Sequence, residues 1–82
     1  MYKYVGLEQV LVNNGAEEIK LALSDIESVI NDKLPKSALK YDAWWGNDKT
    51  HVQAKAWMDA GYRVADRAEP IKSRVVTFFR LR

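Results

Sequence analysis

Hydrophobic and polar residues alternate along the chain with two different periods. Apolar side chains at the i, i+3 and i+4 spacing, starting at Leu7, predict a helix over about residues 5–13. Asn14 and Gly15 follow it, and these residue types accept the left-handed backbone at a helix end. Residues 18–23 then alternate with period two, which is typical of a half-buried strand.

Two further helices are predicted from capping signals. In a capping box, the N-cap side chain and the third helical residue each accept the other's backbone N–H. The pairs with this spacing are Ser24 with Glu27 and Thr50 with Gln53. They predict helices over about residues 24–32 and 51–60. The first should end before Pro35, because a proline ring crowds the preceding residue out of the helical region.

The order of the elements indicates the fold class. Residues 62–64 and 75–81 have the pattern of strands, with 68–73 as a long hairpin loop between them, and residues 37–41 suit a further helical turn. The order helix, strand, helix, helix, strand, strand is that of a winged helix with a three-stranded antiparallel sheet. We therefore predict one small winged-helix-like α+β domain over residues 1–82. It is atypical because roughly fifteen residues replace the usual short turn between the second and third helices. An unrelated small α+β fold would give the same order.

The composition limits the chemistry that this chain can perform. Its 82 residues contain no cysteine and one histidine, which excludes disulfides, thiolate metal sites, thiol catalysis and any site with two histidines. The sequence has no glycine-rich phosphate loop and no nucleophile elbow. We expect a protein that is not an enzyme and uses no cofactor or metal. No apolar run approaches the ~18 residues of a membrane helix and no signal peptide is visible, so we expect a cytoplasmic protein without membrane contact.

The charged residues are unevenly divided along the chain. The net charge is +2, but three lysines against six acids leave −3 on residues 1–34, and ten cations against five acids leave +5 on residues 35–82. A basic half favours an anionic partner, with nucleic acid as the first candidate and DNA before RNA. An ordinary solvated surface is the alternative.

The third helix and the segment before it supply candidate contact residues. In an extended chain Trp44 and Trp45 point to opposite sides, so one fills the core while the other stacks on a base or anchors a protein. The alternative is that both are buried with their N–H groups satisfied. Asn47 and Gln53 suit adenine, and His51 lies beside the helix start. Alternatively, these three only fix the turn and cap the helix. The cations expected at phosphates are Lys49, Lys55, Arg63, Arg74 and Arg80.

The last strand is apolar on both faces, although an edge strand of a small domain normally has one wet face. One face has Val76 and Phe78, and the other has Val75, Phe79 and Leu81. Either the first helix covers the second face, or another chain does. We expect a homodimer through residues 75–81. The alternative to nucleic-acid binding is a protein-interaction module, such as a phage-encoded inhibitor of a host enzyme or defence complex.

Three spaced motifs lie between residues 34 and 61. They are Leu34-Pro35-x-Ser37-Ala38, Trp44-Trp45-x-Asn47 and His51-x-Gln53-Ala54-x-Ala56-Trp57-x-x-Ala60-Gly61. Together with Tyr4, Leu7 and the Ile26-Glu27 pair, they resemble a family of small bacterial and phage domains that are mostly uncharacterised. Gly46 stands where that family often has alanine, and Tyr62 where it often has tryptophan. The resemblance implies a nucleic-acid or defence role, because such domains occur alone or beside nuclease and other DNA-related modules.

Overall fold

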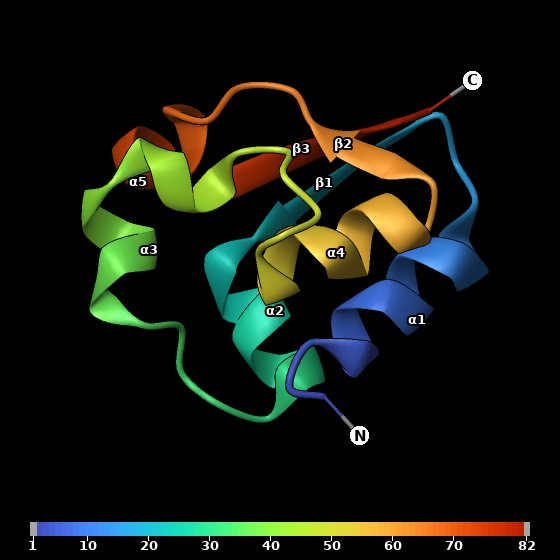
Figure 1. The fold of residues 1–82 in the computed structure, drawn as a ribbon, viewed down its shortest axis with the longest axis horizontal. Coiled ribbons are helices and arrows are strands. Elements are labelled where there is room, and N and C mark those ends of the chain that lie inside the picture. The colour runs from blue at the N-terminus through green and yellow to red at the C-terminus, as the bar shows by residue number, and fades with distance from the viewer. Residues whose placement is uncertain (1, 82) are drawn as a thin grey trace.

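The sheet lies on one side of the molecule and the three longer helices lie on the other (Figure 1). The computed structural model describes residues 2–81, so the ends of the expected domain, residues 1 and 82, lie outside it. Its elements are α1 (Val5–Asn14), β1 (Glu18–Ala22), α2 (Leu23–Ile30), α3 (Lys36–Lys40), the 3₁₀ helix η1 (Asp42–Trp45), α4 (Val52–Asp59), β2 (Tyr62–Val64), α5 (Glu69–Ser73) and β3 (Val75–Arg80). Helices α1, α2 and α4 pack below the sheet, whereas α3, η1 and α5 gather at one end of it (Figure 1).

The three strands form an antiparallel sheet in the order β1-β3-β2. The predicted α+β class with a three-stranded antiparallel sheet is therefore confirmed, while the winged-helix assignment stays a prediction. Two details of the prediction are wrong. Strand β3 is central and not at an edge, and the connection over 68–73 contains helix α5 instead of a hairpin loop.

The register of the sheet assigns each side chain to a face, because directly opposite residues point the same way. The inner face carries Ile19, Leu21, Tyr62, Val64, Val76 and Phe78, and it meets the buried leucines of α1. The outer face carries Glu18, Lys20, Arg63, Thr77 and Phe79. Glu69 of α5 accepts a hydrogen bond from the Thr77 hydroxyl (2.9 Å) and pairs with Lys20 (3.7 Å). Helix α5 therefore covers one end of the outer face and leaves the Phe79 end open.

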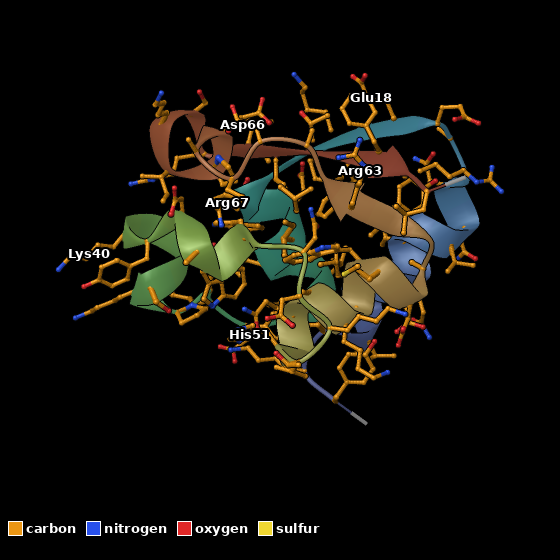
Figure 2. The ribbon with its side chains drawn as sticks, turned by 45° about the horizontal axis from the view of Figure 1, so that its top comes forward. Glu18, Lys40, His51, Arg63, Asp66 and Arg67 are labelled. Atoms are coloured by element: carbon orange, nitrogen blue, oxygen red, sulfur yellow. The ribbon has the colours of Figure 1, made fainter. Side chains whose placement is uncertain are left out.

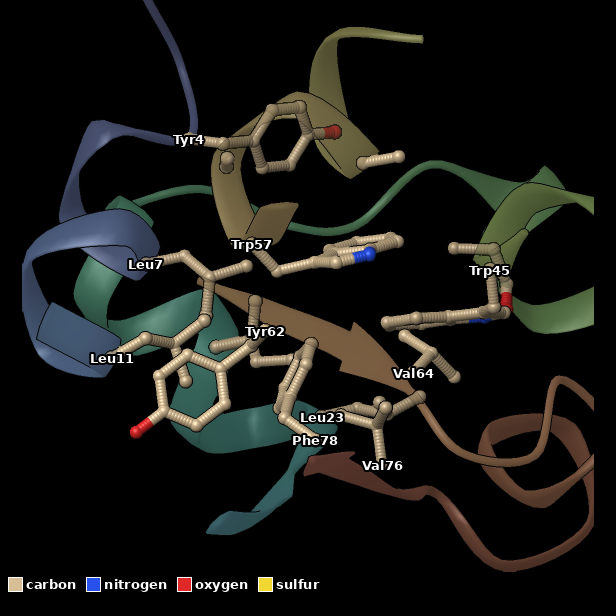
Figure 3. Close-up of a cluster of buried hydrophobic side chains, with 14 of the residues drawn as sticks. Tyr4, Leu7, Leu11, Leu23, Trp45, Trp57, Tyr62, Val64, Val76 and Phe78 are labelled. Carbon is tan, nitrogen blue, oxygen red and sulfur yellow. The ribbon is translucent and has the colours of Figure 1, made fainter. Parts of the chain in front are cut away.

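Aromatic rings form the centre of the core (Figure 3). The indoles of Trp45 and Trp57 stack with their centroids 6.0 Å apart, and Phe78 lies 5.7 Å from Trp57. All three side chains are 0% exposed. Trp45 Nε1 donates to the Ala38 carbonyl (2.8 Å), and Trp57 Nε1 donates to Asn47 Oδ1 (2.9 Å). Each buried indole N–H is thus satisfied, as buried donors need to be.

The predicted capping box of the second helix does not form. Helix α2 begins at Leu23, one residue before Ser24, the N-cap expected from the sequence. Asp25, and not Glu27, reaches back to the N–H of Ala22 (3.0 Å). The helix therefore starts directly from the strand, without a side-chain cap from Ser24.

The predicted capping box of the third helix does not form either. Helix α4 begins at Val52, after an N-cap residue whose side chain makes no capping bond. The Thr50 hydroxyl donates to Asp48 Oδ1 (2.7 Å), and Gln53 donates to the Trp44 carbonyl (3.1 Å). Both side chains thus have partners in the preceding loop.

The side chain of Asn47 closes the free edge of β2. Its Oδ1 accepts from Trp57 Nε1 and from the Val64 N–H (2.8 Å), and its Nδ2 donates to the Val64 carbonyl (3.0 Å). Since β2 pairs with β3 on its other side, the amide bonds Val64 as a further strand would. One side chain thus joins the loop before α4, the buried indole and the sheet.

We expect the Asn47→Ala variant to lose about 2–4 kcal/mol of unfolding free energy, because it leaves a buried indole N–H and the groups of Val64 unpaired. Urea unfolding checks this. Asn13→Ala, at an exposed position of α1, is the matched control and should stay within about 0.5 kcal/mol of wild type. Equal stability of the two variants would show that the Asn47 bonds are dispensable.

Gly6 marks a close approach of α1 to α2. A Cβ atom at this position would lie 2.0 Å from the Val29 carbonyl oxygen, which is part of the helix backbone. We expect Gly6→Ala to destabilise the domain by about 3 kcal/mol, because the two helices must separate. Thermal melting beside Val12→Ala, an exposed change on the same helix, checks this. A melting temperature equal to that of the control would contradict it.

Candidate functional site

The two adjacent tryptophans do not divide between core and solvent as expected. Residues 42–45 form a 3₁₀ helix, so the alternation of an extended chain does not apply. Trp45 is fully buried, and Trp44 is partly buried with its ring edge-on to Tyr4, 6.1 Å away. Trp45 thus fits the alternative expectation, that of a buried indole whose N–H is satisfied by a carbonyl. Trp45 is therefore not available to a partner.

The polar residues before and in α4 are largely occupied within the domain. The amide of Asn47 bonds Val64 and Trp57. Gln53 is 8% exposed and donates to the Trp44 carbonyl. Neither amide is free for the base contact predicted from the sequence. His51 is exposed, and its Nε2 lies 3.8 Å from a carboxylate oxygen of Asp48.

The exposed side of α4 is not basic. Lys49 (3.4 Å) and Lys55 both pair with Asp59. The hydrogen bond from Lys55 and the charges of both lysines hold the pKa of Asp59 below its usual range, so this carboxylate stays ionised near neutral pH. Asp48 lies in the preceding loop, and Glu8 of α1 is close enough to act on Lys55. Three acids thus surround the two lysines expected to contact phosphate.

The three arginines expected to contact phosphate lie in different environments. Arg74 ends α5 with a left-handed backbone (φ 56°), and its guanidinium donates to the Ile71 carbonyl (2.6 Å). Arg80 donates to the Gly15 carbonyl (2.9 Å). Arg63 projects from the outer face of the sheet without an ion-pair partner among residues 2–81. Two of the three therefore bond the backbone, and these arginines do not form one surface with α4.

A different group of cations gathers where α3, η1 and α5 meet, and we call it the basic end. Its members are Lys36, Lys40, Arg67 and Lys72. All four are exposed, and none has an ion-pair partner among the described residues. Helix α3 packs on both α5 and η1, and Lys40 and Arg67 lie at the same end of the molecule (Figure 2).

Half of the described lysines and arginines outside the basic end are ion-paired, whereas Lys33, Arg63, Arg74 and Arg80 have no ion-pair partner among residues 2–81. Lys3 pairs with Asp32 (3.3 Å), Lys20 with Glu69, and Lys49 and Lys55 with Asp59. The acids in the segments of the basic end are Asp42, Asp66 and Glu69, one fewer than the four cations, and Glu69 is paired with Lys20. Sequence reasoning missed the basic end because its members come from separate elements. The one local signal was the spacing of Lys36 and Lys40, which places them one helical turn apart.

A hollow of about 310 Å³ opens at the basic end, between residues 40–42 and residues 68–72. It is lined by Lys40, Tyr41, Asp42, Ala68, Ile71 and Lys72. Tyr41 is 55% exposed, and Lys40 Nζ lies 5.4 Å from the centre of its ring. The basic end therefore combines unpaired cations, an exposed aromatic ring and a recess.

A second hollow, of about 560 Å³, lies at the open end of the outer sheet face. Its lining residues are Glu17, Glu18, Arg63, Phe79, Arg80 and Leu81. Phe79 and Leu81 are 37% and 43% exposed. In the register of the sheet, Phe79 lies directly between Glu18 and Arg63. This row combines an acid, an aromatic ring and a base (Figure 2 labels its two charged members).

Two further searches concern metals and membranes. Within residues 2–81, no group of three or more histidine, aspartate or glutamate side chains is placed to hold a metal ion. No helix in the same range is long and apolar enough to cross a bilayer.

Comparison with known proteins places the chain in a family. Residues 4–80 match the model of a family described as a domain of unknown function, DUF7662. Comparisons with curated proteins and with solved structures give no match. Because the family model covers nearly the whole sequence, this chain belongs to the DUF7662 family.

Proposed function

We propose that this chain is a small, non-enzymatic cytoplasmic module that binds nucleic acid, DNA before RNA, through its basic end. The observation that carries the proposal is the gathering of four unpaired cations beside an exposed tyrosine, while four lysines elsewhere are ion-paired. Nucleic-acid affinity comes largely from cations that replace the counterions of phosphates. The four unpaired cations of the basic end, which outnumber its acids, favour such a partner.

Local charge favours the basic end over α4 as the contact surface. A phosphate approaching Lys49 or Lys55 also meets the carboxylates of Asp59 and Asp48. At the basic end four cations stand against three acids. Of these, Asp66 Oδ1 accepts a hydrogen bond from the Ala68 N–H (2.9 Å) and Glu69 pairs with Lys20 (3.7 Å). Because the summed field of a surface steers a charged ligand, the basic end is the more attractive site.

Salt titration tests the proposal. If the four cations each contact a phosphate, log K should fall against log salt with a slope of about −2.8 on single strands and about −3.6 on duplex DNA. Lys40→Ala or Lys72→Ala should each reduce that slope by about 0.7 to 0.9 on any base sequence. Fluorescence anisotropy with labelled oligonucleotides gives these values.

Lys49→Ala is the matched control, since it removes the same charge from an exposed residue outside the basic end. It should leave the slope unchanged. A lower slope for Lys49→Ala together with an unchanged slope for Lys40→Ala would place the contact on α4, as the sequence suggested. A wild-type protein that binds neither probe at low salt would favour the protein-interaction alternative.

A second candidate is self-association through the outer sheet face, favoured by the row of Glu18, Phe79 and Arg63. Neither charged member has an ion-pair partner among residues 2–81. Since neighbouring strands lie ~4.8 Å apart, the acid and the base stand about 10 Å apart on either side of the phenyl ring. A two-fold axis along β3 would stack the two Phe79 rings and set Glu18 of each copy against Arg63 of the other. The row is therefore complementary to itself.

A charge swap tests this dimer. We expect wild type to show a dimer below about 100 μM by light scattering, the range in which an interface of ordinary size holds. Arg63→Glu should give a monomer, because four carboxylates would then meet. The double variant Glu18→Arg with Arg63→Glu should restore the dimer. A wild-type monomer mass up to about 100 μM at low salt, or no restoration by the swap, would exclude this interface.

A further inference from the structure

We infer that the hollow at the basic end holds one unstacked base of a single-stranded nucleic acid, with Tyr41 as the stacking surface and Asp42 as the acceptor for an amino group of the base. The inference rests on the proposed function and specifies the ligand of the same surface. It is carried by the chemistry of the hollow, which offers three different kinds of contact to one nucleotide.

The size and lining of the hollow suit a base. Its volume of about 310 Å³ lies at the lower end of ligand sites, which span roughly 300–1,000 Å³. Ala68, just before α5, and Ile71 of α5 supply apolar surface, and Lys40 of α3 and Lys72 of α5 also line the hollow. A flat ring can therefore be covered by apolar groups while its phosphates meet ammonium groups.

Tyr41 is held in place but leaves its ring exposed. Its backbone N–H donates to the Ser37 carbonyl (2.9 Å), which ends α3, and its carbonyl accepts from the Trp44 N–H (3.2 Å), which starts η1. The residue thus belongs to two helices at once, yet its side chain is 55% exposed. Because the backbone of Tyr41 is fixed in this way, presenting its ring to a base costs little backbone freedom, which favours stacking.

Lys40 extends the same arrangement to a phosphate. Its ammonium lies over one face of the Tyr41 ring, 5.4 Å from the ring centre, so the opposite face is the one left to stack on a base. A nucleotide offers a phosphate to the ammonium and a base to that opposite face. Single-strand binding proteins combine these two contacts in the same way.

The carboxylate of Asp42 distinguishes the hollow from a simple phosphate site, which would contain no acid. It lines the hollow, is exposed and has no hydrogen-bond or ion-pair partner among residues 2–81. A carboxylate repels phosphate, but it accepts hydrogen bonds from amino groups on base edges, as in the pairing of aspartate with cytosine N4. Thymine has no exocyclic amino group, so the site should prefer cytosine over thymine.

Single strands should be preferred over duplex, because an unstacked base is needed to enter the hollow. The probes are labelled dC and dT ten-residue strands and a duplex of equal length. Tyr41→Ala should weaken dC binding about five- to 150-fold, the range for losing one stacked base. Tyr41→Phe should bind dC as wild type does. Asp42→Ala should remove the preference for dC over dT. Since both residues are exposed, melting curves should stay unchanged.

The results separate this inference from the proposed function. If Lys40→Ala and Lys72→Ala lower the salt slope but Tyr41→Ala leaves dC binding unchanged, the base site is wrong and the basic end still binds nucleic acid. Equal loss on single strand and duplex in Tyr41→Ala would also overturn the base site. A dT affinity at or above that of dC would remove the role of Asp42. If wild type binds no probe, both proposals fall.

Discussion

The hydrogen-bonding requirement of two buried indole rings governs the arrangement of this domain. Trp45 and Trp57 stack in the core with no exposure, so each N–H needs an acceptor inside the protein. The Ala38 carbonyl meets the first, which holds α3 against η1. Asn47 meets the second and at the same time bonds the edge of β2. Helix α3, placed in this way, packs beside α5. The basic end is therefore a consequence of how the buried indole N–H groups find their acceptors.

The same architecture divides the surface into parts with different charge. Asp59 lies between two lysines on α4, and Glu69 pairs with Lys20 over the sheet. These carboxylates neutralise their neighbourhoods, whereas the four cations of the basic end have no ion-pair partner among residues 2–81. The proposed dimer uses the open end of the outer sheet face, which is lined by other residues than the hollow of the basic end. The two proposals are thus compatible, and a dimer would present two basic ends to one strand, which raises its effective affinity.

Local patterns predicted much of the fold but little of the candidate site. Helical and strand periods located α1, β1, β2 and β3 within a few residues, and capping signals did the same for α2 and α4. The capping boxes failed because Glu27 and Gln53 have other partners: Glu27 accepts from the Leu34 N–H, and Gln53 donates to the Trp44 carbonyl of η1. Asn47 and Gln53 were chosen for their residue types, which suit bases, but the same amides also suit buried backbone groups. Residue type alone does not distinguish these two uses.

The sequence by itself determined the order of the elements and the α+β class, because periodicity, turn residues and helix ends depend on neighbours within a few positions. It also determined the absence of cysteine chemistry and the excess of charge in residues 35–82. Only the tertiary structure decided that β3 is central, that Trp45 is buried, and that Lys49 is paired whereas Lys40 is not. The physical reason is that burial and ion pairing are sums over side chains from distant parts of the chain. Such sums exist only once the elements have packed.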